Sequence, residues 1–237
     1  MKRFIFTHKE LPEDFPYNDY EIIRNDLSDE LDHHIWGELA GYKILYNRII
    51  NEKDENGMLL WDDMEYISLN HYRRIFNRNA VDNIYIPTPY KVATSVYNAY
   101  GIYHYIGDLE LCRQAINEEF PIIANNLEKY LNGNIFIPYN MSIMQVFQFK
   151  DYMKFLFKIL YNLHKKIGTN TYEERLDYIR NNADKYTGEA KNNKIEYQAR
   201  IEGFCAERLS TIYWLYLSTF LNINTTNILL LEPLQYI

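Results

Sequence analysis

The sequence predicts an α/β fold in which a mixed sheet with parallel strand pairs is flanked by helices, with a more helical C-terminal part. Short runs of β-branched and aromatic residues end in polar turns, longer segments carry apolar residues at helical spacing, and the two kinds alternate. The 237 residues, 47% hydrophobic and 24% charged, have the composition of a globular protein. We therefore expect one folded domain over residues 1–237.

The first half of the chain supplies the predicted parallel strands. Residues 3–7 and 20–23 have strand-like composition, and residues 35–49 repeat apolar side chains at helical spacing. Residues 66–69 and 84–86 are further short apolar runs bounded by polar residues or proline. This strand, helix, strand order at this spacing favours an α/β sheet with parallel strand pairs.

The second half is predicted to be mainly helical. Its longest helix has a single apolar stripe and is expected to end at Gly168. The polar segment between this helix and the last one shows no sustained periodicity and is interpreted as a mobile surface insert. In chain order, the predictions are helices at 108–116 and 118–130, extended segments at 134–138 and 142–144, a helix at 149–167, the insert at 169–196 and a final helix at 200–221.

Charge and motifs exclude several classes of protein. A net charge of -7 disfavours broad binding to nucleic acid. Cys112 and Cys205 lack the spacing of a metal site or a disulfide framework, which favours a reducing compartment. Without a secretory signal or a sufficiently long apolar segment, the chain is expected to be soluble and cytoplasmic. Gly-rich phosphate loops and a GxSxG elbow are missing, which disfavours NAD, P-loop ATP and acyl-transfer enzymes.

One basic cluster follows the apolar strand at 66–69. Ligands of open α/β sheets gather at the carboxyl ends of strands, and His71, Arg73 and Arg74 are placed there. Two guanidiniums and an imidazole suit the recognition of a diphosphate. The alternative is an exposed basic turn. The 23 tyrosines suit a sugar site or a core equally well.

The residues around this cluster resemble a known family. YISLNHYRRIF at 66–76 is similar to the YIGLxHYRRYF signature of bacterial capsular and exopolysaccharide glycosyltransferases, a former domain of unknown function with galactofuranosyltransferase-like members. Five more segments resemble motifs of this family in the same order: FIFTHK at 4–9, WGELAGY at 36–42, YHYIGDL at 103–109, NMSIM at 140–144 and RIEGFCAERL at 200–209.

The resemblance implies a GT-A-like, Rossmann-like glycosyltransferase. A nucleotide-binding half at about 1–110 and an acceptor-binding half at about 111–237 would transfer a hexose, with inversion, from a UDP-sugar to a surface-polysaccharide, glycan or lipid-linked oligosaccharide acceptor. Membrane contact would be peripheral at most. A non-catalytic glycan-binding or assembly protein is the alternative, and a phosphate-ester hydrolase is a third interpretation.

The same resemblance assigns roles to individual residues. The diphosphate would be bound by His71, Arg73 and Arg74, already singled out by their position. The other implied residues are Thr7, His8 and Lys9 beside the donor nucleotide, Glu38 as a further donor-site acid, His104 and Asp108 in the donor-sugar or acceptor pocket, and Glu207 with Arg208 closing the site.

Glu207 is the first candidate for the base that takes the acceptor's proton. It lies on a helix rich in small and apolar residues, where partial desolvation would strengthen it. Its alternative role is an ion pair with Arg208 or Arg200. His104 is the second candidate, and its alternative is a packing role. Glu38 could instead cap its own helix.

A metal site is not evident from the sequence. Many GT-A enzymes hold Mn²⁺ with a DxD pair after the corresponding strand, but Asp62 and Asp63 precede it here, and Asn70 and Tyr72 follow it. The adjacent arginines could neutralise a leaving diphosphate without a metal, so metal independence is favoured. Mn²⁺ or Mg²⁺ held by His71 and a distant carboxylate stays an alternative.

Overall fold

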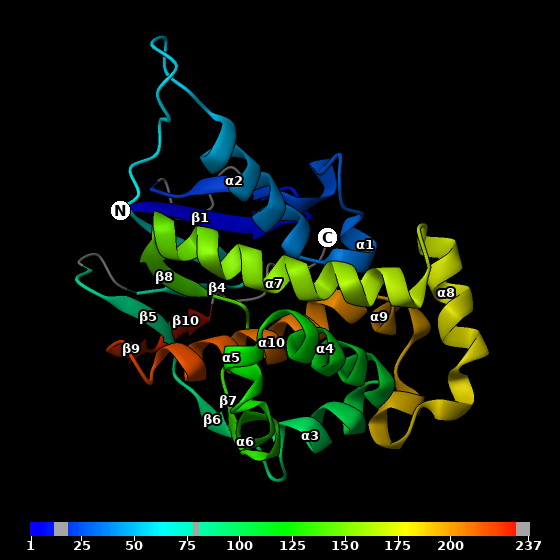
Figure 1. Ribbon diagram of the computed structural model, residues 1–237. Coiled ribbons are helices and arrows are strands. Elements are labelled where there is room, and N and C mark those ends of the chain that lie inside the picture. Colours follow the sequence, from blue (N-terminus) through cyan, green and yellow to red (C-terminus); the bar gives the residue numbers. More distant parts are fainter. Residues whose placement is uncertain (12–18, 78–80, 231–237) are drawn as a thin grey trace.

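Two parallel strands end side by side at one edge of the central sheet. The computed structural model describes residues 1–11, 19–77 and 81–230 (Figure 1). Strand β1 (Lys2–Thr7) pairs in parallel with β2 (Glu21–Arg24) and with β3 (Tyr66–His71), and Phe6 is in register with His71. The predicted parallel pairs are thus confirmed. The loops that follow β1 and β3 are delivered to the same edge.

The other strands make the sheet mixed. β8 (Ser142–Gln145) pairs antiparallel with β3 and with β5 (Ile84–Pro87), which pairs in parallel with β9 (Ile223–Thr226). The short β4 (Arg74–Phe76) folds back from β3 and pairs with β10 (Ile228–Leu230). A separate ribbon joins β6 (Tyr90–Lys91) to β7 (Ile135–Phe136). The mixed α/β class predicted from the sequence is confirmed.

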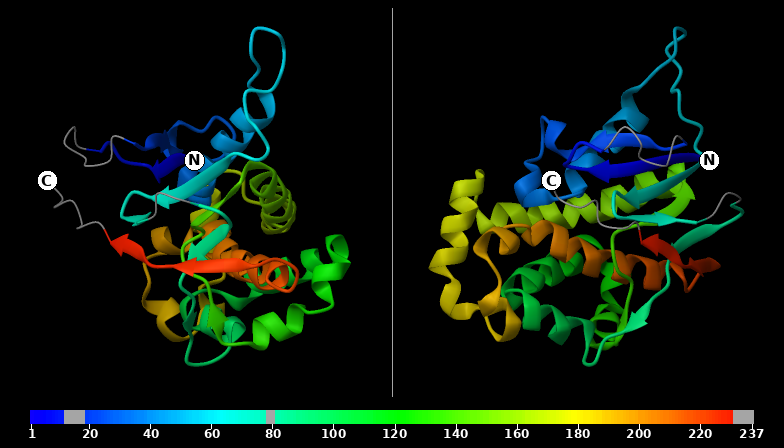
Figure 2. Two further views of the ribbon diagram at one scale, coloured as in Figure 1. Left: turned by 90° about the vertical axis from the view of Figure 1, so that its left-hand side faces the viewer. Right: turned by 180° about the vertical axis from the view of Figure 1, so that it is seen from behind.

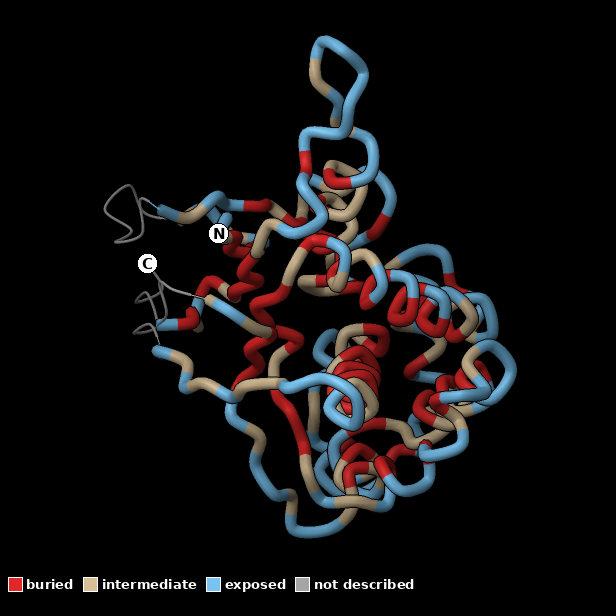
Figure 3. The backbone as a smooth tube through the Cα atoms, turned by 60° about the vertical axis from the view of Figure 1, so that its left-hand side comes forward, coloured by how far each residue is buried: buried red, intermediate tan, exposed pale blue. Residues whose placement is uncertain are grey.

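Helix α7 (Val146–Ile167) packs against β8 and lies among α2 (Leu39–Asn51), α4 (Ile106–Glu119) and α10 (Ile201–Leu217) (Figures 1 and 2). It begins at a reciprocal capping box of Gln145 and Gln148 and ends at Gly168, whose φ of 73° is the left-handed conformation expected at a helix end. The buried residues concentrate in the strands and in the helices next to them (Figure 3). The other helices are α1 (His33–Trp36), α3 (Val96–Tyr103), α5 (Pro121–Ala124), α6 (Leu127–Asn132), α8 (Tyr172–Asn181) and α9 (Ile195–Gln198).

Two predicted helices are interrupted. The segment 35–49 is divided between α1 and α2 because Gly37 adopts φ 59°, a conformation that L-residues disfavour. The predicted helix 118–130 breaks because Pro121 cannot continue α4 and instead starts α5. The last helix ends at Leu217 and β9 follows shortly afterwards. Strand β4 and helix α3 were not predicted at all.

The segment 169–196 is not the surface insert that its polarity suggested. It contains α8, which starts at a capping box of Thr171 and Glu174. Arg175 on this helix is fully buried, and its guanidinium donates two hydrogen bonds of 2.7 Å to Glu202 on α10. His164 lies 2.8 Å from the same carboxylate. The prediction failed because Arg175 is charged and yet occupies the inward face of α8, where an apolar pattern would place an aliphatic residue.

Within residues 1–11, 19–77 and 81–230, none of the helices combines the length and the apolar character needed to cross a membrane. Four lysines of α7 contact acidic residues, the first being Lys150, whose Nζ lies 2.6 Å from Asp63. Lys154 pairs with Asp151, Lys158 with Glu119 at 3.2 Å, and Lys166 lies 4.0 Å from Glu118.

Candidate functional site

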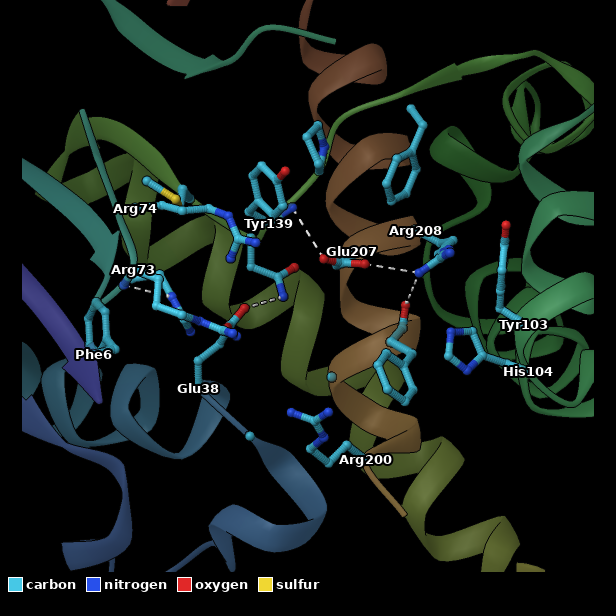
Figure 4. Close-up of a pocket in the computed structure, with 18 of the residues that line it drawn as sticks. Phe6, Glu38, Arg73, Arg74, Tyr103, His104, Tyr139, Arg200, Glu207 and Arg208 are labelled. Atoms are coloured by element: carbon cyan, nitrogen blue, oxygen red, sulfur yellow. Dashed lines mark hydrogen bonds and ion pairs between the residues drawn. The ribbon is translucent and has the colours of Figure 1, made fainter. Parts of the chain in front are cut away.

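A cavity of about 420 Å³ opens at the edge where β1 and β3 end (Figure 4). The loop between β3 and β4 forms one side, helix α10 forms another, and α3 with the β6–β7 ribbon forms the rim opposite the sheet. Both halves of the chain therefore contribute to it. Seven of the residues singled out in the sequence line this cavity: Glu38, His71, Arg73, Arg74, His104, Glu207 and Arg208.

Two unpaired arginines form the side of the cavity nearest the sheet. Within the described ranges, no carboxylate lies within ion-pair distance of Arg73 or Arg74. The guanidinium of Arg74 stacks on the Tyr139 ring at 4.1 Å, which leaves its edge free for a ligand. Tyr139 itself has φ 65°, a conformation that is costly for a residue with a side chain. The backbone strain at Tyr139 thus coincides with a wall of the cavity.

His71 is a neutral donor in this group rather than a third cation. Burial, and after it the charges of Arg73 and Arg74, lower the pKa of His71 to about 3. Its Nδ1 accepts a hydrogen bond of 3.2 Å from the backbone N–H of Arg73, so the ring proton is assigned to Nε2. The basic cluster noted in the sequence therefore presents two charged guanidiniums, of Arg73 and Arg74, and one neutral N–H, of His71.

Two carboxylates face the centre of the cavity. Glu207 accepts a hydrogen bond of 3.2 Å from the backbone N–H of Tyr139 and pairs with Arg208 at 3.0 Å. Glu38 accepts a hydrogen bond of 2.8 Å from the Asn140 amide. Burial raises the pKa of Glu38, although the Asn140 hydrogen bond opposes this shift. The alternative that Glu38 caps its own helix is wrong, because its side chain makes no capping hydrogen bond.

His104 and Arg208 lie at the end of the cavity away from the sheet. Burial, followed by the charge of Arg208, lowers the pKa of His104 to about 3. The His104 ring stacks on Phe204 at 3.9 Å, and its Nδ1 lies 3.0 Å from the Gln198 side-chain oxygen. A histidine with so low a pKa is a weak base at neutral pH, so Glu207 is the better candidate of the two.

Thr7 ends β1, His8 and Lys9 follow it, and none of the three lines the cavity. The Thr7 hydroxyl is buried and exchanges hydrogen bonds with the backbone of Lys9. His8 is exposed, with its ring 5.7 Å from that of Tyr72 and 6.1 Å from that of His33. The structure brings this segment to the correct edge of the sheet, beside the cavity rather than inside it.

Asp108 is buried beneath the cavity and does not line it. The Tyr178 hydroxyl on α8 donates a hydrogen bond of 3.2 Å to it. Burial raises the pKa of Asp108 to about 7, in spite of that hydrogen bond and of the nearby Arg175 charge. Its contacts are those of a buried polar network between α4 and α8.

Because the pKa of Asp108 is raised by folding, its protonated form favours the folded state. This contribution is complete below pH 4 and is lost as the pH rises through about 7. Asp108→Asn keeps the shape without the charge, so above pH 7 its free energy of unfolding should exceed that of the wild type by up to about 4 kcal/mol. Urea unfolding at pH 5 and pH 8 measures this difference.

The control for this prediction is Asp177→Asn on α8, because the Asp177 side chain is exposed. It should change stability little at either pH. Equal pH dependence of the wild type and Asp108→Asn would contradict the buried-acid interpretation.

Among the described residues that line the cavity, no three His, Cys, Asp or Glu side chains come together as a metal site would need. Asn70, which follows the strand where a DxD pair was sought, uses its amide to bind the backbone of Phe4 and Phe76. In the described part of the chain, the one group of three potential metal ligands is Asp32, His33 and His34. This group lies outside the cavity lining. The two cavity glutamates already accept hydrogen bonds from protein groups, so the site's own cations are the arginines.

Three residues of the site were not selected from the sequence. Arg200 precedes α10 and points into the cavity, Tyr139 links Arg74 to Glu207, and Asn140 joins Glu38 to Ser210 on α10. Arg200 and Asn140 stand inside the quoted motifs, so position alone could have indicated them. The strained backbone of Tyr139 gives no signal in the sequence.

The fold and the cavity define the class as an α/β protein with an arginine-lined cavity at the carboxyl ends of β1 and β3. Residues 79–179 match the sequence profile of a family described as a domain of unknown function (DUF4422). Two of the six motifs noted above, at 103–109 and 140–144, lie in this segment.

A solved structure gives a similarity over nearly the whole chain. The apo structure of the bifunctional glycosyltransferase WbbM superposes with a TM-score of 0.69 and 18% identity, over 98% of this chain and 45% of that one. The chain thus spans less than half the length of that protein. No curated protein matches the sequence. The predicted glycosyltransferase-like α/β fold is confirmed by this superposition.

Proposed function

We propose that this protein is a glycosyltransferase that moves a hexose from a nucleotide diphosphate sugar, UDP-sugar first, to a glycan acceptor. The observation that supports this most directly is the cavity itself, where unpaired arginines and a carboxylate face one space at the carboxyl ends of β1 and β3. The glycosyltransferase-like fold and the six family motifs agree with it. The surface-polysaccharide acceptor rests on those motifs alone.

In the proposed reaction, Arg73, Arg74 and the Nε2–H of His71 bind the diphosphate. The acceptor hydroxyl attacks the anomeric carbon, the bond from this carbon to the diphosphate oxygen breaks, and the electron pair leaves with the diphosphate. Glu207 takes the hydroxyl proton. Attack on the face opposite the leaving group inverts the anomeric configuration. The arginines stabilise the charge that develops on the leaving group, so no step needs a metal.

The two halves of the chain divide this work in the proposal. Residues 1–110 supply the diphosphate cradle, and residues 111–237 supply the base. Exposed aromatic rings at the rim, Tyr90, Tyr103 and Tyr197, provide flat surfaces on which sugar rings of the acceptor can stack. His8 and Lys9, which follow β1 at the same edge of the sheet, are the residues that would contact the nucleoside in this proposal.

Nucleotide binding tests the proposal. UDP at 100 times its Kd should raise the free energy of unfolding by about 2.7 kcal/mol, seen as a rise in Tm. Arg73→Gln/Arg74→Gln should weaken UDP binding by about 100-fold or more, because each charge-assisted hydrogen bond to phosphate contributes about 1.5–3 kcal/mol. Isothermal titration with UDP, GDP, CMP and TDP measures both the affinity and the base preference.

Arg113→Gln is the matched control, because Arg113 lies on α4 and pairs with Glu110 and Glu128 instead of facing the cavity. It should leave UDP affinity unchanged. If no nucleotide binds, or if the double variant binds as the wild type does, the proposed donor site is wrong.

The exposed rim aromatics also favour a second candidate, a glycan-binding protein without transfer activity. Glycan binding without turnover of any nucleotide sugar would support this candidate. Donor hydrolysis that does not depend on an acceptor would instead indicate a hydrolase.

A further inference from the structure

Arg200 is a third cation of the cavity without an acidic partner. It occupies the N-cap position of α10, and its guanidinium lies 5.1 Å from the Tyr197 ring centroid and 5.5 Å from that of Phe204. Among the residues that the structure describes, no carboxylate lies within ion-pair distance of it. Figure 4 shows it projecting between the Glu38 side and the His104 side of the cavity. The aromatic rings fix its position without neutralising its charge.

The charges of a nucleotide sugar do not account for Arg200. A donor diphosphate carries about two negative charges, which Arg73 and Arg74 match from the sheet side. Glu207 pairs with Arg208, and His71 and His104 are neutral. Glu38 also lines the cavity, and burial raises its pKa, but its carboxylate is not within ion-pair distance of Arg200. Among the cavity's guanidiniums, Arg200 is therefore the one that neither a described carboxylate nor the proposed diphosphate pairs with. A partly enclosed cation is unfavourable unless a ligand supplies the missing anion.

Helix geometry places this charge on the acceptor side. Arg200 and Glu207 are separated by seven residues, close to two turns of helix, so both point to the same face about 10 Å apart along the axis. This span is comparable to one or two sugar units. An acceptor with its hydroxyl at Glu207 would extend along α10 and meet Arg200. Arg208, whose Nε has no hydrogen-bond partner within the described residues, lines the same cavity.

We propose that the acceptor carries an anionic group, a carboxylate or a phosphate, and that Arg200 binds it while Glu207 contacts the reacting hydroxyl. This inference rests on the proposed function for its assignment to the acceptor. The preference for anionic over neutral saccharides is a binding property, so it can be measured without any sugar transfer.

The experiment compares three probes by NMR titration: methyl β-glucoside, methyl β-glucuronide and methyl β-glucoside 6-phosphate. At least one anionic probe should bind the wild type at least 10-fold more tightly than the glucoside. Comparison of the glucuronide with the 6-phosphate shows whether the site prefers a carboxylate or a phosphate. Arg200→Gln should remove this preference, because a hydrogen bond to a charged group is worth about 10-fold or more in affinity. Arg200→Lys should restore part of it. Arg113→Gln should have no effect.

UDP titration of the same variants separates this inference from the proposed function. UDP affinity should be unchanged in Arg200→Gln. If Arg200→Gln weakens UDP binding instead, Arg200 belongs to the donor site and the inference is wrong. Equal binding of neutral and anionic probes by the wild type also overturns it. Failure of UDP to bind the wild type refutes the proposed donor site, and the saccharide preference then shows independently whether the anion site exists.

Discussion

Glu207→Gln is expected to lower kcat for sugar transfer by about 10²–10⁴-fold, the usual contribution of a general base. Glutamine retains an oxygen for the Tyr139 N–H but cannot take a proton from the acceptor. Because Glu207 faces the centre of the cavity rather than the arginines of the diphosphate cradle, UDP affinity should stay within about twofold. Radiolabel transfer and isothermal titration measure the two quantities.

Glu38→Gln is the matched variant for this experiment. It keeps a hydrogen-bond acceptor for Asn140, and its carboxylate lies in the same cavity. Its effect on kcat should be much smaller than that of Glu207→Gln. The opposite order, with Glu207→Gln active and Glu38→Gln inactive, would assign the base to Glu38, whose pKa is raised by burial.

The second large effect concerns stability. Arg175→Leu should lower the free energy of unfolding by about 3–5 kcal/mol, because it leaves the fully buried Glu202 carboxylate with only His164 beside it. For a chain of this size, that loss corresponds to a fall in Tm of about 6 °C or more. Thermal and urea unfolding measure it.

The double variant Arg175→Leu/Glu202→Leu is the control, since it removes both charges. It should recover part of the stability that the single variant loses, because a buried pair replaced by apolar residues is often neutral. A double variant less stable than Arg175→Leu by a further 3–5 kcal/mol would show that the two residues act independently.

The sheet was predictable because its strands have short-range signals. Residues 3–7 and 66–69 are apolar runs with polar ends, and the fixed polarity of parallel strands brings the residues after them to one edge. Helix α7 was predictable from its single stripe of apolar residues and from Gly168 at its C-terminal end. In contrast, α8 buries Arg175 together with Ile179, and this charged residue weakens the apolar pattern of its inward face.

Part of the cavity could also be predicted, and the limit has a physical cause. His71, Arg73 and Arg74 follow a strand directly, so local order alone places them. Asp108 was grouped with His104 because the two are near neighbours in a motif, yet the turn of α4 directs Asp108 into the interior. The low pKa values of His71 and His104 depend above all on burial, which the sequence does not show.

The position of Tyr139 has a consequence for the order in which substrates would bind. One residue supports the guanidinium of Arg74 with its ring and orients Glu207 with its backbone N–H. A small displacement of Arg74 is thus transmitted to Glu207 through Tyr139, and a displacement of Glu207 is transmitted to Arg74, because such coupling is reciprocal. Neither order is therefore compulsory: whichever substrate enters first should change the affinity for the other by the same factor.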